Sequence, residues 1–317
     1  MEFETTLTGH EPVALTIGNF DGIHRGHQRL MHELRATAAA LKSRAALVTF
    51  APHTLLVVRP EIDLQLLTTL EEKLALTRQY GGIEDSIVIH FTPEVKAMSA
   101  EAFLDALRAR FPIRALVVGE DFSLGRNRMG DVAFLQEYGR KHDILIRSIA
   151  LEEDERERIS STRIRTLVGE GKIGEANELL GHPLTMSGPV VHGDHRGRLL
   201  GFPTANLIPP PHKLLPANGV YAITVTVPSA PGGDSAADSR VYNGVANIGI
   251  RPTFNGKERI VEAHLLDIEL DLYEKRITID FIARLRDEQR FAGIEALKAQ
   301  IAADAQQARQ LLQAAGG

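Results

Sequence analysis

Apolar and polar positions alternate along the first half of the chain with two different periods. Short apolar runs lie at residues 13–17, 45–50, 86–89, 115–118 and 144–149. Between these runs, apolar residues recur at helical spacing at about residues 28–42, 70–80, 100–110 and 132–142, and Ser99 is placed to cap the third helix. Apolar strands that alternate with helices form a parallel sheet covered on both faces. The pattern therefore predicts a doubly wound α/β domain.

The pattern changes after a helix predicted at residues 174–180. Short apolar stretches lie at residues 189–192, 219–227, 241–248, 261–266 and 276–283, with no helical period between them. This spacing favours a small antiparallel β-barrel, whose first strand we expect only after Met186. Residues 228–239 are rich in Pro, Gly and Ser and predict a hairpin loop, and a terminal helix is predicted at 294–312. We place the boundary at Pro183, which gives domains of residues 1–183 and 184–317.

The composition limits the possible chemistry and location. The chain has 317 residues, 44% of them hydrophobic, and a formal charge of −5 with acids and bases interspersed. It has no cysteine, which excludes disulfides, iron–sulfur clusters, thiolate zinc sites and cysteine nucleophiles. Residues 1–11 lack the layout of a secretory signal, and no apolar run approaches the roughly 18 residues of a membrane span. We expect a cytoplasmic protein with no membrane or nucleic-acid partner, and a homo-oligomer is left open.

The first chemical motif is the string Gly18-Asn-Phe-Asp-Gly-Ile-His-Arg-Gly-His27, between the first strand and the first helix. Ligands of open α/β sheets bind at the carboxyl ends of the strands, and a helix N-terminus offers free N–H groups to phosphate. His24 and His27 share one helical face, where two imidazoles can donate hydrogen bonds to phosphate oxygens. The glycines that allow a tight turn and a close approach to a ligand are Gly18, Gly22 and Gly26. Two surface histidines near a cap and a zinc site are the alternatives.

A second string, Ile159-Ser-Ser-Thr-Arg-Ile-Arg165, begins the helix after the last strand of the sheet. Ser161 and Thr162 offer hydroxyls, and Arg165 can pair with phosphate oxygens. A plain helix cap with a solvated arginine is the alternative. Together with the first motif, in this order, the string favours nucleotide chemistry, and both resemble the phosphate-binding signatures of the nucleotidylyltransferases.

The third motif is His192-Gly-Asp-His-Arg-Gly-Arg-Leu-Leu-Gly-Phe-Pro-Thr-Ala-Asn206. Its glycines allow a loop to fold over phosphate, and Thr204 and Asn206 supply hard oxygen donors suited to Mg²⁺. The chain lacks GxxxxGK[ST], HRD and DFG, so neither common kinase fold explains this phosphate chemistry. A glycine-rich hairpin loop is the alternative.

This stretch closely resembles the riboflavin kinase signature that ends in Pro-Thr-Ala-Asn. Segments 219–221, 244–253, 261–267 and 271–273 resemble the same family in the same order. In the first half, segments 49–50, 67–69 and 119–122 resemble the adenylyltransferase module that is fused to the kinase in bacteria. The resemblance covers nearly the whole chain and points to the bifunctional riboflavin kinase/FMN adenylyltransferase family.

The resemblance implies an activity and a set of site residues. The enzyme would phosphorylate riboflavin to FMN with ATP and Mg²⁺, and then transfer an adenylyl group from a second ATP to give FAD and pyrophosphate. Glu262 would be the general base of the kinase, His24 and His27 would assist adenylyl transfer, and Thr204 and Asn206 would hold Mg²⁺. The ATP-binding residues of the adenylyltransferase would be Gly18, Phe20, Asp21, Gly22, Gly26, Ser161, Thr162 and Arg165, with Asp121 and Phe122 near the flavin. Those of the kinase would be Gly193, Gly197, Arg198, Gly201 and Pro203.

The sequence departs from the family pattern at a few positions. Ala51 replaces a glutamate that is usual there, and Glu274 replaces a commoner glycine. Ile268 and Leu270 stand where phenylalanine and glycine are commoner, and we expect activity to survive these changes. Two other functions stay open at this point: an adenylyltransferase whose barrel only binds flavin, and a flavin sensor without catalysis.

Overall fold

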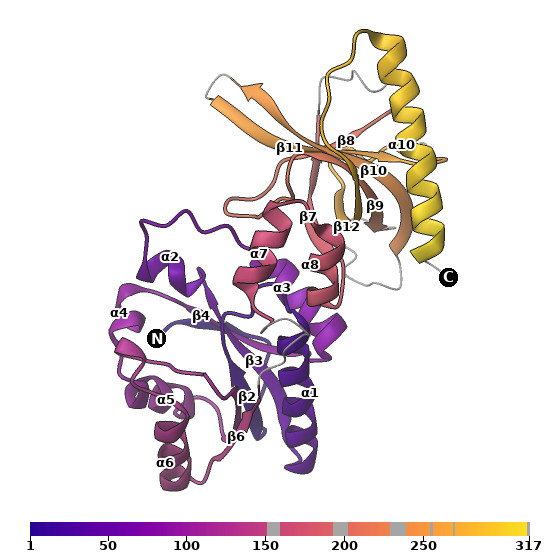
Figure 1. Ribbon diagram of the computed structural model, residues 1–317. Coiled ribbons are helices and arrows are strands. Elements are labelled where there is room, and N and C mark those ends of the chain that lie inside the picture. The colour runs from indigo at the N-terminus through magenta and orange to yellow at the C-terminus, as the bar shows by residue number, and fades with distance from the viewer. Residues whose placement is uncertain (151–158, 193–201, 229–238, 254–255, 269, 316–317) are drawn as a thin grey trace. The chain divides into compact units, whose positions relative to one another are not determined.

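A computed structural model describes residues 1–150, 159–192, 202–228, 239–253, 256–268 and 270–315. The chain folds into two compact units, Met1–Leu64 with Lys73–Ser161 and Gln65–Glu72 with Thr162–Gly317 (Figure 1). The chain therefore changes unit after residues 64, 72 and 161.

The first unit is built on a six-stranded sheet with the order β1-β4-β3-β2-β5-β6. Five neighbouring strands are parallel, which confirms the predicted α/β fold. The sixth, β1, was not predicted and pairs antiparallel with β4 at one edge. The strands are β1 Phe3–Thr5, β2 Val13–Ile17, β3 Arg44–Ala51, β4 Asp85–His90, β5 Ile113–Gly119 and β6 Leu145–Ile149.

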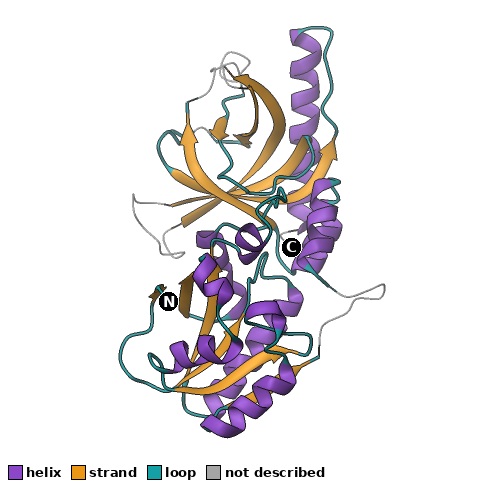
Figure 2. Ribbon diagram, turned by 90° about the vertical axis from the view of Figure 1, so that its left-hand side faces the viewer, coloured by secondary structure: helices purple, strands orange, loops and turns teal. Residues whose placement is uncertain are grey.

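Apolar side chains cover both faces of this sheet because successive residues of a strand point to opposite faces. Leu15 of β2 lies in one core cluster with Leu104 and Leu135, and its neighbour Ala14 lies in the other with Leu34. Helices lie on both sides of the sheet in Figure 2. They are α1 Arg25–Ala40, α2 Thr54–Val58, α3 Leu70–Leu76, the π-helical turn Thr77–Gly81, α4 Pro93–Ala97, α5 Ala100–Arg108, the 3₁₀ turn Arg126–Arg128 and α6 Val132–His142.

Side-chain caps fix where several of these helices begin. Ser99 accepts a hydrogen bond from the Ala102 amide at 3.1 Å, as predicted for α5. Asp131 caps α6 in the same way at 2.9 Å. The five-residue helices α2 and α4 were not predicted, because so short a segment shows no measurable hydrophobic period.

The second unit is a closed antiparallel barrel with the strand order β10-β11-β8-β7-β12-β9, which confirms the predicted barrel (Figure 2). Its strands are β7 Leu184–Val191, β8 Ala205–Leu207, β9 Gly219–Pro228, β10 Ser239–Thr253, β11 Gly256–Leu265 and β12 Arg276–Arg286. The expectation that the first barrel strand starts only after Met186 was wrong, because the apolar alternation of β7 already begins at Leu184. The three-residue strand β8 was not predicted, and its first two residues are the last two of the motif that ends at Asn206.

Two helices before the barrel belong to the same unit, α7 Ser161–Gly169 (apart from its first residue) and α8 Ile173–Leu180. The Asn177 side chain of α8 donates to the Phe281 carbonyl of β12 at 2.8 Å and accepts from the Leu184 amide at 2.8 Å. These bonds explain why the compact units divide the chain earlier than the sequence boundary at Pro183.

The terminal helix α10, Ile294–Ala315, packs on the barrel as an amphipathic helix. Its buried residues Ala305, Ala308 and Leu312 contact Ala222 and Leu266 in one apolar cluster. Next to Ala305, the Arg286 guanidinium donates three hydrogen bonds to the buried Asp304 carboxylate, Nε–Oδ1 at 2.9 Å, Nε–Oδ2 at 3.1 Å and Nη2–Oδ2 at 2.7 Å.

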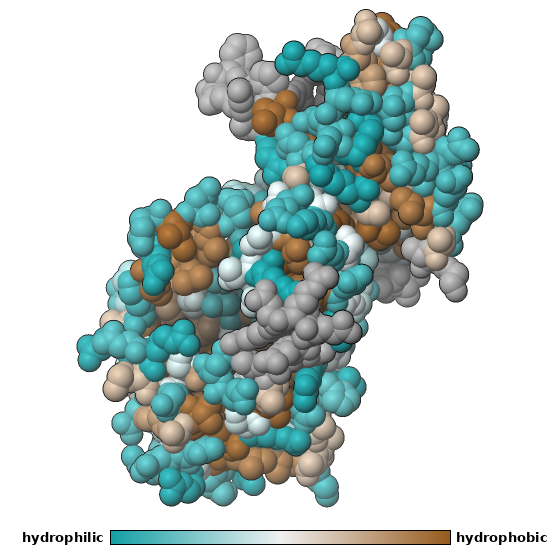
Figure 3. All heavy atoms as spheres, viewed as in Figure 1, coloured by the Kyte–Doolittle hydropathy of each residue, from teal (hydrophilic) through white to brown (hydrophobic). Residues whose placement is uncertain are grey.

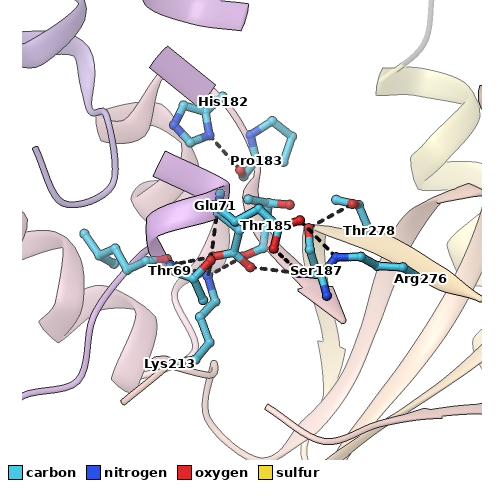
Figure 4. A network of polar contacts seen from close by, with 11 residues as sticks. Thr69, Glu71, His182, Pro183, Thr185, Ser187, Lys213, Arg276 and Thr278 are labelled. Carbon is cyan, nitrogen blue, oxygen red and sulfur yellow. Dashed lines mark hydrogen bonds and ion pairs between the residues drawn. The ribbon is translucent and has the colours of Figure 1, made fainter. Parts of the chain in front are cut away.

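Residues 65–72 also belong to the barrel unit and are held there by a buried ion pair (Figure 4). Lys213 Nζ lies 2.6 Å from Glu72 Oε2, and the two side chains are 0% and 1% exposed. The same ammonium donates to the Leu67 and Thr185 carbonyls, each at 2.6 Å. Glu72 Oε1 accepts from the Ser187 amide of β7 at 2.7 Å. Each charge is thus compensated by hydrogen bonds as well as by its partner.

The molecular face drawn in Figure 3 is mostly polar, with apolar side chains in small separate areas. The large apolar residues that are exposed, such as Met129 and Val241, come from different units. Among the described helices, none combines the length and the apolarity needed to cross a membrane.

Candidate active sites

The Gly18–His24 loop connects β2 to α1 at the carboxyl edge of the parallel sheet. Three residues of this loop have a positive φ, Phe20 (+50°), Gly22 (+86°) and Ile23 (+42°). Phe20 and Ile23 are nevertheless buried, so their apolar side chains offset the conformational cost and anchor the loop. The first turn of α1 carries no acidic side chain, which leaves its N-terminus suited to an anion.

The two histidines of the motif lie together at the start of α1. The rings of His24 and His27 stack with centroids 3.6 Å apart, and the Phe20 ring meets His27 edge-on at 5.1 Å. His24 occupies the N-cap position in an extended conformation and is buried, whereas His27 is half-buried in the first turn. The predicted pairing of the two imidazoles on one side of the helix start is therefore present.

The second motif meets the first through Ser161. Its hydroxyl donates to the backbone carbonyl of Asp21 at 2.9 Å. Asp21, a residue of this loop, is buried, with 2% of its surface exposed. Thr162 and Arg165 follow on the same helix, α7, in the second compact unit. Within the first compact unit, this hydrogen bond thus joins the Gly18–His27 string to Ser161, the residue at which that unit ends.

A polar network that sequence reasoning missed supports the same loop. The Thr49 hydroxyl at the end of β3 donates to the Asn19 carbonyl at 3.2 Å, and Lys73 Nζ of α3 donates to Thr49 Oγ1 at 3.2 Å. Asn19 and Thr54 exchange two further bonds, of 2.9 and 3.2 Å. Burial lowers the pKa of Lys73 to about 8, and the charge of Asp21 opposes this shift. Lys73 lies in an acidic amphipathic helix, so no local pattern marked it.

Asp121 and Phe122 follow β5, which neighbours β2 in the sheet. The Phe122 amide donates to the Gly119 carbonyl at 3.0 Å, so the chain turns directly at the strand end. Phe122 packs half-buried against the apolar cluster that contains Leu116, and Asp121 is exposed. Because neighbouring parallel strands end at one edge, these two residues lie on the same edge of the sheet as the Gly18–His24 loop.

In the barrel, the paired strands bring the candidate kinase residues into one row. Glu262 of β11 lies directly opposite Asn206 of β8 on one side and Asn247 of β10 on the other. Directly opposed residues point to the same face of an antiparallel sheet, so the three polar side chains share a face. Val261 and Ala263 point to the other face and are fully buried, while Glu262 is half-buried. Asn247 was not predicted as a site residue.

A hydrogen bond from the His264 side chain holds the Pro203–Asn206 segment close to this row of polar residues. Ladder pairing ends at Ala205, because Pro203 has no N–H to donate. The imidazole Nδ1 of His264, two residues beyond Glu262, lies 2.8 Å from the Pro203 carbonyl oxygen, and this nitrogen is the donor. Thr204 is half-buried and Asn206 is 5% exposed. Gly193, Gly197, Arg198 and Gly201 lie outside the described residues.

The donors near Glu262 suit a hard cation. Thr204 offers a hydroxyl, Asn206 an amide oxygen and Glu262 a carboxylate, all of them oxygen ligands of the kind that Mg²⁺ accepts. Within the described part of the chain, His, Asp and Glu side chains do not gather in threes that would hold a metal ion on their own. This donor set therefore fits a Mg²⁺ ion that is shared with nucleotide phosphates, which complete its coordination.

The two halves of the chain match two family models. The FAD synthetase model matches residues 7–163, and the riboflavin kinase model matches residues 180–312. The bifunctional riboflavin kinase/FMN adenylyltransferase of Escherichia coli K12 is 38% identical over 301 residues, which cover 95% of this chain and 93% of the relative. The Pseudomonas fluorescens protein of the same name is 37% identical over 309 residues and covers 95% and 94%.

A solved structure has the same fold over nearly the full length. It is described as a macrolide-efflux protein from Streptococcus pneumoniae and superimposes with a TM-score of 0.83 at 28% identity, covering 96% of both chains. The family models divide the sequence into the same two halves as the predicted motifs, and the relatives match both halves in one alignment. The chain therefore belongs to the bifunctional riboflavin kinase/FMN adenylyltransferase family.

Proposed function

We propose that the barrel unit phosphorylates riboflavin to FMN, and that the α/β unit converts FMN to FAD, each with ATP. The observation that carries this proposal is that each half of the chain matches its own family model, residues 7–163 that of FAD synthetase and residues 180–312 that of riboflavin kinase. A cytoplasmic location, the oligomeric state and the absence of nucleic-acid and membrane partners stay predictions of the sequence.

In the adenylyltransferase, a phosphate oxygen of FMN attacks the α-phosphorus of ATP, and the bond to the β-phosphate oxygen breaks to release pyrophosphate. His24 and His27 donate hydrogen bonds to the α-phosphate oxygens as negative charge builds there. The Gly18–His24 loop, with Gly26 in the first turn of α1, places backbone N–H groups near the phosphates. Ser161, Thr162 and Arg165 add donors, and Asp121 with Phe122 flank the flavin. The stacked geometry of the two imidazoles supports this assignment.

In the kinase, Glu262 accepts the proton of the riboflavin 5′-hydroxyl as this oxygen attacks the γ-phosphorus of ATP and ADP leaves. Thr204 and Asn206 would hold Mg²⁺, which would supply positive charge to offset the negative charge of the transferred phosphoryl group. The contribution of proton transfer is modest, because positioning and charge stabilisation dominate phosphoryl transfer. The row Asn206–Glu262 across β8 and β11 supports these roles. Pro203 and the glycines of residues 193–201 are proposed to cover the ATP phosphates.

A single time course tests both activities. The protein is incubated with riboflavin, ATP and Mg²⁺, and the flavins are resolved chromatographically. We expect FMN to appear first and FAD to follow, with no FAD when riboflavin is replaced by a flavin that lacks the 5′-hydroxyl. Accumulation of FMN without FAD would exclude the adenylyltransferase activity. Conversion of supplied FMN to FAD without any phosphorylation of riboflavin would exclude the kinase activity.

A further inference from the structure

Lys73 is a buried charge that the two proposed mechanisms do not use. Of the lysines and arginines whose burial the structure describes, only Lys73 and Lys213 are buried. Lys213 faces the carboxylate of Glu72, as its burial requires. Lys73 is 4% exposed and donates instead to a neutral hydroxyl, that of Thr49. Burying an ammonium group is unfavourable unless other interactions compensate for it, so the burial of Lys73 calls for an explanation.

The contacts of Lys73 connect helix α3 to the Gly18–His24 loop through strand β3. Lys73 Nζ donates to Thr49 Oγ1 at 3.2 Å, and Thr49 Oγ1 donates to the Asn19 carbonyl at 3.2 Å. Thr49 is 0% exposed, so water does not compete for its single hydroxyl proton. With the lysine as donor on one side, that proton can only point toward Asn19. The charge of Asp21, in the same loop, favours protonated Lys73.

We propose that Lys73 is a positioning residue of the adenylyltransferase site, which holds the Gly18–His24 loop in its binding conformation through Thr49. The loop contains two non-glycine residues in the left-handed region, Phe20 and Ile23, and such backbone relaxes when its supports are removed. His24 and His27 follow directly, so a shift of the loop moves both donors away from the phosphate. This inference rests on the proposed assignment of the loop to ATP binding.

The test compares four variants of the full-length chain, Lys73→Met, Thr49→Val, their combination, and Thr49→Ser. FAD formation from supplied FMN and riboflavin phosphorylation are measured on the same preparations. We expect each of the first two variants to lower kcat/KM for FAD formation about 10- to 100-fold, since small misplacements have effects of this size. Riboflavin phosphorylation should stay within about 2-fold, and Thr49→Ser should restore most FAD formation because it keeps the hydroxyl.

The double variant distinguishes two ways in which Lys73 could affect the reaction: through its hydrogen bond to Thr49, which we call the relay, or through direct contact with the substrate. If Lys73 acts through Thr49, the double variant is no slower than the slower single variant. Full activity of Thr49→Val beside an impaired Lys73→Met, or multiplied losses in the double variant, would overturn the proposal. Thr37→Val is the matched control, because Thr37 is a buried threonine of the same unit whose hydroxyl donates to the Glu33 carbonyl. An equal loss of FAD formation in Thr37→Val would also overturn it.

Two further results keep the test decisive. If the Lys73→Met protein does not fold, FAD formation by Thr49→Val is compared with that by Thr49→Ser. Equal FAD formation by these two variants would overturn the proposal. If the assignment of the loop itself is wrong, His27→Ala retains full FAD formation. That outcome is distinct from failure of the proposed positioning role of Lys73, in which His27→Ala is strongly impaired while Thr49→Val is normal.

Discussion

At the scale of single residues, His24 and His27 depend on one bend of the backbone. His24 stays extended at the N-cap while His27 is already helical, and this change of conformation brings the two rings into a stack. The edge of Phe20 supports His27, and Phe20 itself is buried in the core cluster beneath α1. Packing of Phe20 in the hydrophobic core therefore supports the geometry of two imidazoles at the carboxyl edge of the sheet.

The first prediction concerns this pair. His27→Ala removes one donor to the α-phosphate and should lower FAD formation from FMN by about 10²–10³-fold. Riboflavin phosphorylation should be almost unchanged, because the kinase residues lie in the other unit. The measurement is the rate of each step with its own flavin substrate. A normal rate of FAD formation in a folded variant would exclude His27 from the reaction.

The converse prediction concerns Glu262. Glu262→Gln keeps the size of the side chain and removes the proton acceptor, so riboflavin kinase turnover should fall while supplied FMN is still converted to FAD. Asn247→Ala is a useful companion, because Asn247 lies opposite Glu262 on the same face of the ladder. If Glu262→Gln retains the full kinase rate, the carboxylate is an ordinary strand residue and another group accepts the proton.

The site residues that were predicted and those that were missed differ in how they are signalled. Gly18, His24 and Asn206 belong to contiguous strings whose composition is unusual, so a local pattern marks them. Lys73 contacts Thr49, and Asn247 lies opposite Glu262, and both partners are on other elements of the chain. Such pairs depend on sheet order and strand register, and a single sequence states neither of these.

At the scale of elements, the turn before β12 explains one departure from the family pattern. Glu274 has a φ of +63°, in the left-handed region where a side chain is strained and glycine is not. Its amide nevertheless donates to the Val190 carbonyl at 3.2 Å, so the turn keeps its bond to β7. The commoner glycine at this position is therefore a matter of backbone conformation.

This strain gives a stability prediction. Glu274→Gly should raise the free energy of unfolding by about 1 kcal/mol, since it relieves the positive φ at some cost in chain entropy. Glu274→Ala is the control: it removes the charge but keeps the strained Cβ, and it should bring no such gain. Thermal and urea unfolding of the three proteins provide the comparison. Equal stabilisation by alanine and glycine would show that the charge, rather than the backbone, is responsible.

Strand β12 also carries a carboxyl group whose titration affects stability. Burial raises the pKa of Asp280 to about 6, and the nearby charge of Glu72 adds to this effect. The folded protein thus favours protonated Asp280, so its contribution to stability falls as pH rises from about 4 to about 6 and is constant above that range. Asp280→Asn should stabilise the protein at pH 7, by an amount on the order of 1–3 kcal/mol.

The pH dependence of this gain is the sharper measurement. Because protonated aspartic acid and asparagine are both neutral, the difference in unfolding free energy between Asp280→Asn and the parent should disappear below about pH 4. A gain that is the same at pH 4 and pH 7 would show that burial of charged Asp280 is not its source.

The elements themselves were largely predictable from hydrophobic period. Long segments such as 132–142 gave both their type and their bounds, and α6 spans Val132–His142. The misses are short or edge elements, β1, β8, α2 and α4, because three to five residues carry too little period to read. The number and spacing of the strands predicted a barrel. They did not predict the order of its strands, which the structure shows.

At the scale of the whole molecule, the sequence could not reveal that residues 65–72 belong to the barrel unit while the residues before and after them belong to the α/β unit. Glu72 looks like any acidic residue in the first turn of a helix, yet it is the partner of Lys213 in the barrel unit. Arg276 of β12 pairs with Glu71 beside it (Figure 4). The predicted boundary between functions at Pro183 therefore differs from the division of the chain into compact units.

We propose that the kinase activity is separable at Pro183 although the compact unit is larger. A fragment of residues 184–317 contains the whole barrel, with Pro203, Asn206 and Glu262, and should phosphorylate riboflavin. A fragment of residues 162–317 also keeps Asn177 and its bonds to β7 and β12, and should melt at a higher temperature. A folded 184–317 fragment that makes no FMN would show that the kinase site needs residues outside the barrel.

The last prediction uses Lys213 to measure how much residues 65–72 contribute to the stability of the barrel unit. In the full chain, Lys213→Met leaves Glu72 buried without its partner, and breaking such a pair costs about 3–5 kcal/mol. In the 184–317 fragment Glu72 and Leu67 are absent, so Lys213 loses those acceptors and the same substitution should change stability by less than about 1 kcal/mol. Unfolding of the four proteins gives the comparison. A large loss in both backgrounds would mean that Lys213 supports the barrel by itself, and that residues 65–72 only rest on it.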